Sequence, residues 1–158
     1  MNPKKQAGFS LIELLIVITI IGIIASIAIP NLLASRRAAN EGSAQQSLRT
    51  IVSCEAAYKF TYGNGSYADL PTLGAKVMTD ATLSTGQKSG YNFVATPVPG
   101  PPELFWAYAF PATSTGIAAT GTRRFAAVED AVLRGDTNLA AGPPTDDTAV
   151  RSMLPMGN

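Results

Sequence analysis

The sequence predicts an α+β fold in which a long amino-terminal helix spans a membrane and then backs a small antiparallel β-sheet. Three observations predict it. The 16 residues from Leu14 to Ile29 carry no charge, and only Thr19 and Ser26 among them have polar side chains. An alanine-rich stretch with helical periodicity continues to about Tyr62. Strand-forming segments then follow one another without helices between them, which favours an antiparallel meander.

The apolar segment is long enough to cross a bilayer. From Phe9 to Pro30 there are 22 residues, and a helix of that length extends roughly 33 Å. Lys4 and Lys5 precede the segment, and basic residues beside a span are held on the cytoplasmic side. We therefore expect insertion with the amino terminus in the cytoplasm. An ordinary secretory signal peptide is a poorer match, because its apolar region is only about 7–15 residues long.

A carboxylate stands close to the start of this segment, at Glu13. A charged side chain inside a membrane costs about 2.5–3.5 kcal/mol on insertion scales and usually marks a function. The alternative is that Glu13 lies near the interface and reaches the aqueous side. No Lys or Arg occurs between Phe9 and Ser35, so an α-amine is the best local counter-ion for Glu13.

The composition excludes several classes of function. The 12 basic and 11 acidic residues give a net charge of +1, which leaves no electrostatic footprint for nucleic acid. The chain has no histidine and a single cysteine, Cys54, so histidine-dependent catalysis, an intramolecular disulfide and CxxC metal or redox motifs are excluded. We expect no enzymatic activity, no cofactor and no metal site. Cys54 is expected to be a small buried apolar residue, with an intermolecular disulfide as the alternative.

The heptapeptide from Gly8 to Leu14, Gly-Phe-Ser-Leu-Ile-Glu-Leu, follows a short basic leader and precedes the apolar helix. This arrangement resembles the class III signal peptides of type IV pilins and type II secretion pseudopilins, over about residues 1–60. The resemblance implies a pilin-like fold, cleavage after Gly8 by a prepilin peptidase, and N-methylation of Phe9 by the same enzyme. It also implies that the Phe9 amine of one subunit pairs with Glu13 of its neighbour.

Two helix-weakening residues, Gly22 and Pro30, also stand where that family has them. Glycine costs roughly 1 kcal/mol within a helix, and proline removes one of its hydrogen bonds. The resemblance implies that the stretch between Gly22 and Pro30 loosens in a filament. In a lone membrane anchor the same two residues would be tolerated without a function.

The resemblance implies a structural filament subunit with four kinds of partner: further copies of itself in a homopolymer or mixed filament, a prepilin peptidase and methylase, an inner-membrane assembly platform, and membrane lipid. The precursor would lie in the bacterial inner membrane with its head in the periplasm, and the product in a surface pilus or a periplasmic pseudopilus. A type II secretion pseudopilin is the first alternative. A monomeric single-pass protein with a periplasmic binding head is the second.

The chain is expected to divide into a leader over residues 1–8, a membrane and filament-core helix over 9–30, a continuation of that helix over 31–62, and a head over 63–158. Within the continuation, an apolar face at helical spacing is predicted to meet the head; it comprises Ala44, Leu48, Ile51, Val52 and Tyr58.

In the head, residues 68–73 are expected to form a loop or short turn, and four strands are expected at residues 90–95, 104–110, 123–128 and 131–134. The last part, from Asp136 to Asn158, is expected to be a polar tail. Its acidic residues Asp136, Asp146 and Asp147 lack a recognised calcium-binding spacing, which favours a solvated loop over a calcium site.

Overall fold

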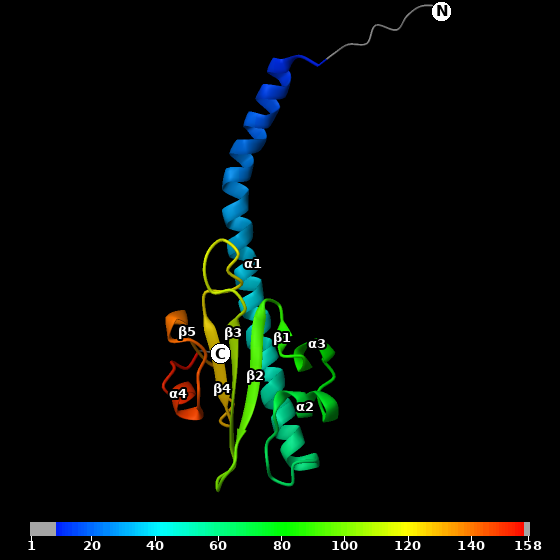
Figure 1. Cartoon of the computed structure of the whole chain (residues 1–158), viewed down its shortest axis with the longest axis vertical. Coiled ribbons are helices and arrows are strands. Elements are labelled where there is room, and N and C mark those ends of the chain that lie inside the picture. Colours follow the sequence, from blue (N-terminus) through cyan, green and yellow to red (C-terminus); the bar gives the residue numbers. More distant parts are fainter. Residues whose placement is uncertain (1–8, 157–158) are drawn as a thin grey trace, which may run out of the picture. The chain divides into compact units, whose positions relative to one another are not determined.

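The computed structural model of the chain describes residues 9–156. The chain divides between Ser35 and Arg36 into two compact units. The first unit contains the apolar part of helix α1 (Leu11–Thr61), and the second contains the remainder of α1 together with the whole head (Figure 1). The α+β fold predicted from the sequence is confirmed.

Helix α1 ends where the sequence places its turn-forming residues, one residue before the expected end. The backbone N–H groups of Tyr62 and Gly63 both donate to the carbonyl of Tyr58, at 2.9 and 2.8 Å, which closes the last turn. A Cβ atom at position 63 would overlap the carbonyl oxygen of Ser66. The reversal of the chain after α1 therefore requires glycine at this position.

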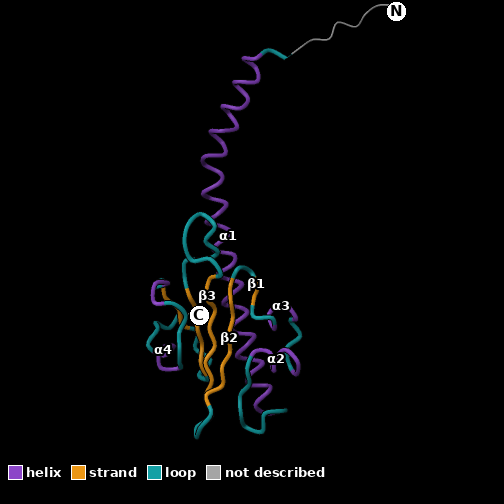
Figure 2. Tube along the Cα trace, in the orientation of Figure 1, coloured by secondary structure: helices purple, strands orange, loops and turns teal. Residues whose placement is uncertain are grey.

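The head is built on a five-stranded antiparallel sheet in which each strand pairs with the next in the chain (Figure 2). The strands are β1 (Gln87–Lys88), β2 (Tyr91–Val98), β3 (Leu104–Pro111), β4 (Arg124–Val128) and β5 (Arg134–Asp136). The expected meander is therefore confirmed, with β3 at its centre. Ala107 of β3 lies opposite Ala95 of β2 and Ala127 of β4.

The sheet turns its face of small residues toward α1. Ala107 and Ala109 are fully buried with Leu48 and Ile51 of the helix, whereas Trp106, Tyr108 and Phe110 on the other face of β3 are only half-buried. Alanine leaves room for the helix to lie close to the strands. The strand predicted at residues 104–110 is confirmed, and so is the burial of Ala44, Leu48 and Ile51 on α1.

Two predictions for the head were wrong. Residues 68 and 69 lie in a loop as expected, but residues 70–73 belong to helix α2 (Leu70–Lys76). The Asp69 carboxylate accepts the Thr72 N–H at 3.1 Å, and a proline occupies the first turn. The fourth strand begins at Arg134 rather than 131. The chain turns tightly before it, since the Ala131 N–H donates to Val128 and Ala131 has a φ of 60°, so strand pairing starts three residues later.

Three further short helices had no counterpart in the sequence prediction. They are α3 (Ala81–Ser84), the 3₁₀-helix η1 (Leu139–Ala141) and α4 (Asp147–Arg151). Helices α2 and α3 lie on the β1–β2 side of the head, and α4 lies on the β4–β5 side (Figure 1). Asp80 and Asp146 cap α3 and α4 through their carboxylates.

Candidate assembly segment and head closure

The two residues predicted to dock neighbouring subunits lie at the start of α1. Phe9 precedes the helix and is 86% exposed. Glu13 is the third helical residue, and its Oε2 accepts the backbone N–H of Ser10 at 3.0 Å. In the single chain this carboxylate therefore caps its own helix, where the helix dipole favours a negative charge. Gly8, the other half of the predicted cleavage site, lies outside the described residues.

The apolar part of α1 presents its side chains outward all round the helix. Its most apolar stretch of 18 residues has a mean hydropathy of 2.8, and none of these residues is buried. The helix is therefore long and apolar enough to cross a membrane. An apolar surface of this size requires lipid or other protein to cover it. The exposed large side chains are Leu11, Ile12, Leu14, Leu15, Ile16, Val17, Ile18, Ile20, Ile21, Ile23, Ile24, Ile27, Ile29 and Leu32.

The two polar side chains inside this segment are satisfied by the helix itself. The Thr19 hydroxyl donates to the Leu15 carbonyl and the Ser26 hydroxyl to the Ile23 carbonyl, both at 2.7 Å. Neither needs water, which suits a membrane interior. Gly22 and Pro30 lie inside one continuous α-helix in the single chain. The loosening between them that the sequence suggested for a filament stays a prediction.

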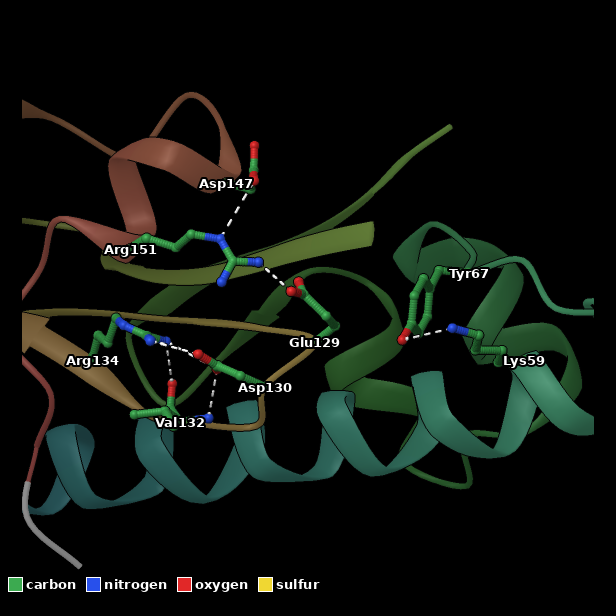
Figure 3. A network of polar contacts seen from close by, with 8 residues as sticks. All are labelled: Lys59, Tyr67, Glu129, Asp130, Val132, Arg134, Asp147 and Arg151. Atoms are coloured by element: carbon green, nitrogen blue, oxygen red, sulfur yellow. Dashed lines mark hydrogen bonds and ion pairs between the residues drawn. The ribbon is translucent and has the colours of Figure 1, made fainter. Parts of the chain in front are cut away.

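Ion pairs hold the carboxy-terminal part of the head, and the sequence analysis missed them (Figure 3). The guanidinium of Arg134, 8% exposed, bonds both carboxylate oxygens of Asp130, at 3.0 and 2.6 Å. Arg151 of α4 lies between Glu129 and Asp147. The charged pair of Arg134 and Asp130 thus fixes the β4–β5 turn, and Arg151 ties that turn to α4.

A third ion pair joins β4 to β5. Arg124 binds Asp136 through two nitrogens, at 2.8 and 2.9 Å, and these bonds hold the pKa of the Asp136 carboxyl below its usual range. Residues 154–156 pair with the chain at β5, since the Gly135 N–H donates to the Leu154 carbonyl and the Met156 N–H to the Leu133 carbonyl. The expectation of a solvated tail was therefore wrong for Asp136, which is ion-paired.

Glu55 of α1 is a second feature that the sequence analysis did not identify. Its side chain is fully buried, Oε2 accepts the Ala68 N–H at 3.1 Å, and Oε1 has no hydrogen-bond partner. Burial disfavours the ionised form, and it raises the pKa of Glu55 to about 7. Burial also raises the pKa of the neighbouring Cys54 thiol, which is only half-buried rather than buried as expected. Within residues 9–156, no three His, Cys, Asp or Glu side chains come together to hold a metal ion.

Comparison with known proteins finds one matching family and several similar relatives. Residues 3–29 match the family described as the prokaryotic N-terminal methylation motif. The type IV wide pilus major component PilA4 of Thermus thermophilus is 47% identical over 77 residues, which cover 46% of this chain and 57% of that protein. The type II secretion system core protein G of Aeromonas hydrophila is 39% identical over 55 residues, covering 35% of this chain and 36% of the relative.

Core protein G of Escherichia coli is 30% identical over 88 residues, which cover 56% of this chain and 59% of the relative. In each of these three relatives the matched region is thus between 36% and 59% of the protein's length. No solved structure matches the chain. The resemblance to type IV pilins and type II secretion pseudopilins predicted from Gly8 to Leu14 is confirmed.

Proposed function

We propose that this chain is the structural subunit of a type IV pilus-like filament, assembled from a bacterial inner membrane after removal of residues 1–8. One observation carries the proposal: an exposed apolar helix with a single carboxylate, Glu13, at its start and no Lys or Arg between Phe9 and Ser35. Lipid covers such a helix in the membrane, and identical helices cover it in a filament. The methylation-motif match over residues 3–29 and the pilin relatives support the same assignment.

Cleavage after Gly8 would change the charges at this end of the chain. It would remove Lys4 and Lys5 and create a cationic amine on Phe9, and N-methylation preserves the charge of that amine. A carboxylate in an apolar environment is stable mainly when a cation neutralises it. We propose that Glu13 leaves the Ser10 N–H of its own chain and binds the Phe9 amine of the neighbouring subunit. A charge-assisted bond of this kind is stronger than the bond to a neutral amide.

The proposal is tested first by mass spectrometry of protein extracted from the membranes of a bacterium that has a prepilin peptidase. We expect a mature chain that begins at methylated Phe9, together with a polymer that sediments after shearing. A chain that begins at Met1 and never sediments would instead identify a monomeric single-pass protein with a periplasmic binding head.

The docking role of Glu13 needs its own variants. We expect Glu13→Ala to be cleaved normally but to give little filament, because the Phe9 amine then lacks its partner. Glu13→Asp is the matched control, since it keeps the carboxylate and loses only one methylene, and we expect it to retain more filament than Glu13→Ala. Normal filament yield from Glu13→Ala would exclude the pairing.

A type II secretion pseudopilin is the second candidate, favoured by the similarity to the core protein G sequences of several bacteria. Cell fractionation distinguishes the two. A pilus is recovered from the culture medium after shearing of intact cells, whereas a pseudopilus of this subunit stays within the cell envelope and its loss abolishes protein secretion.

A further inference from the structure

The connection between α1 and α2, residues 62–69, is attached to α1 in two different ways. Its first half continues the backbone bonds of the helix, since the Gly65 N–H donates to the Lys59 carbonyl at 3.0 Å. Tyr67 and Ala68, in its second half, are held by side chains of the helix instead. The attachment of this second half therefore depends on the chemistry of those side chains.

Glu55 holds Ala68. The Glu55 side chain is fully buried, its Oε2 atom accepts the Ala68 N–H at 3.1 Å, and its Oε1 atom has no hydrogen-bond partner in the described part of the chain. Ala68 itself is buried. A carboxylate that is buried without a cation is costly. The closed position of Ala68 therefore requires the neutral, protonated form of Glu55.

Lys59 holds Tyr67, although it is the cation that stands nearest to Glu55 in the sequence of α1. The Lys59 Nζ atom donates to the Tyr67 hydroxyl at 3.1 Å and lies 4.2 Å from the centre of the Tyr67 ring (Figure 3). Among residues 9–156 Lys59 forms no ion pair. It follows Glu55 by four residues, the spacing at which a glutamate and a lysine pair on the surface of a helix. Lys59 thus has two alternative partners, Tyr67 and Glu55.

The other groups around this site do not favour ionisation of Glu55 in the closed position. Asp69 adds a negative charge that disfavours the ionised form, as burial does. Phe105 of β3, whose ring centre lies 4.7 Å from that of Tyr67, is uncharged. The remaining titratable groups of the surrounding elements are Cys54 and Tyr58 of α1, Tyr62 of the connection, and Lys76 of α2, whose Nζ atom lies 5.8 Å from the centre of the Tyr62 ring. Lys59 is therefore the cation that an ionised Glu55 can reach along its own helix.

We propose that Glu55 and Lys59 form a pH-dependent latch for the connection between α1 and α2. While Glu55 is protonated the latch is closed, with Ala68 bonded to Glu55 and Tyr67 bonded to Lys59. When Glu55 releases its proton to the solvent, its carboxylate pairs with Lys59 at the helix surface, and Tyr67 and Ala68 leave α1. The opening exposes the face of Tyr67 that packs against Phe105. The inference goes beyond the proposed function, because it concerns the head of a single chain and requires neither a filament nor a membrane.

The raised pKa of Glu55 gives the direction and the size of the effect. The closed state binds the proton more tightly, with a pKa of about 7 against an ordinary value of 4.5. The closed latch is therefore favoured most below pH 4.5, and this preference is lost as the pH rises through about 7. With Glu55 at its ordinary pKa in the open state, the ratio of open to closed chains rises roughly 70-fold between pH 5 and pH 8.

Amide hydrogen exchange of the full chain in a non-ionic detergent, resolved by NMR, measures the opening. Ala68 is the reporter, and Ala107 is the matched control, because it is also a buried alanine and lies on the central strand, whose amides we expect to exchange only when the head unfolds. After correction for the chemical effect of pH, exchange at Ala68 should rise by about 70-fold between pH 5 and pH 8. At each pH it should be faster than at Ala107 and, unlike exchange at Ala107, insensitive to low concentrations of urea. Equal protection with equal urea dependence at the two amides, or no rise at Ala68, overturns the inference.

Three variants assign the opening to the groups named. Glu55→Gln keeps an oxygen that can accept the Ala68 N–H but does not ionise, so the rise at Ala68 should disappear; a rise that persists overturns the inference. Lys59→Gln keeps a donor for the Tyr67 hydroxyl and removes the cation, so the rise should be about two-fold smaller, and an unchanged rise overturns the part assigned to Lys59. Tyr67→Phe removes only the hydroxyl that Lys59 binds in the closed state. It should accelerate exchange at Ala68 at both pH values and leave the rise intact, whereas unchanged exchange overturns the role of that bond.

Discussion

The buried carboxyl of Glu55 predicts how the stability of the head depends on pH. Its pKa rises from an ordinary value of 4.5 to about 7 in the folded chain, and one pKa unit corresponds to about 1.4 kcal/mol. The folded state therefore binds this proton more tightly than the unfolded state, by about 3 kcal/mol. The contribution is fully present below pH 4.5, and it is lost as the pH rises through about 7.

Glu55→Gln tests this reasoning. Glutamine keeps an oxygen that can accept the Ala68 N–H, but it does not ionise. The wild-type free energy of unfolding should fall by about 2–3 kcal/mol between pH 5 and pH 8 through Glu55, and the variant should lack this decrease. The new amide adds buried donors, which cost about 1–3 kcal/mol at every pH. The diagnostic quantity is therefore the pH dependence and not the absolute stability.

Denaturant unfolding of the full chain in a non-ionic detergent measures the pH dependence of the free energy of unfolding. The fluorescence of the single tryptophan, Trp106, reports on the head because this residue lies on β3. The carboxyls whose pKa is lowered, such as Asp130 and Asp136, lose their contribution at lower pH and are common to both proteins. Their effect cancels in the difference between wild type and variant. Parallel pH dependence in the two proteins would refute the assignment of the titration to Glu55.

Two further predictions concern the packing of the head and are checked by the same unfolding assay. Arg124→Met should destabilise the head by roughly 2 kcal/mol, because it leaves Asp136 half-buried without its cation. Arg151→Met removes a more exposed ion pair and should cost less than about 1 kcal/mol. Equal losses of stability in the two variants would contradict the expectation that the less exposed pair contributes more. Gly121→Ala should destabilise by more than about 1 kcal/mol, because the added Cβ would overlap the hydroxyl and the Cζ atom of Tyr91. In a Tyr91→Phe background only the overlap with the hydroxyl is removed, so Gly121→Ala should cost less there than in the wild type, and an equal cost would contradict that contact.

The sequence predicted those features that depend on local pattern. The uncharged run from Leu14 to Ile29 predicted the apolar part of α1, and the strand-forming residues from Leu104 to Phe110 predicted the central strand. These signals lie within one element, and their periods distinguish a helix from a strand. The end of α1 was also predictable, since Gly63 lies two residues beyond its last residue, Thr61.

Features that depend on residues far apart in the chain were not predictable in this way. From the sequence alone, Glu55 is expected to be an exposed residue of a helix. Its burial depends on the segment around residue 68 packing against α1, and no local pattern predicts that contact. Arg124 and Asp136 form an ordinary pair of surface charges in the sequence, and only the register of β4 with β5 brings them together. Asp69 and Pro71 are residues that favour the start of a helix, but residues 68–73 were interpreted as a loop or short turn.

Arg134, Arg151 and the pairing of residues 154–156 with β5 close the head. This closure has a consequence for how the protein folds. With Cys54 as its sole cysteine, the head reaches its final form without an oxidant or a disulfide isomerase. The fold of the head therefore depends on packing, strand pairing and ion pairs and not on an intramolecular disulfide. Because ion pairs contribute to this closure, we expect a higher ionic strength to weaken the attachment of α4 to the rest of the head.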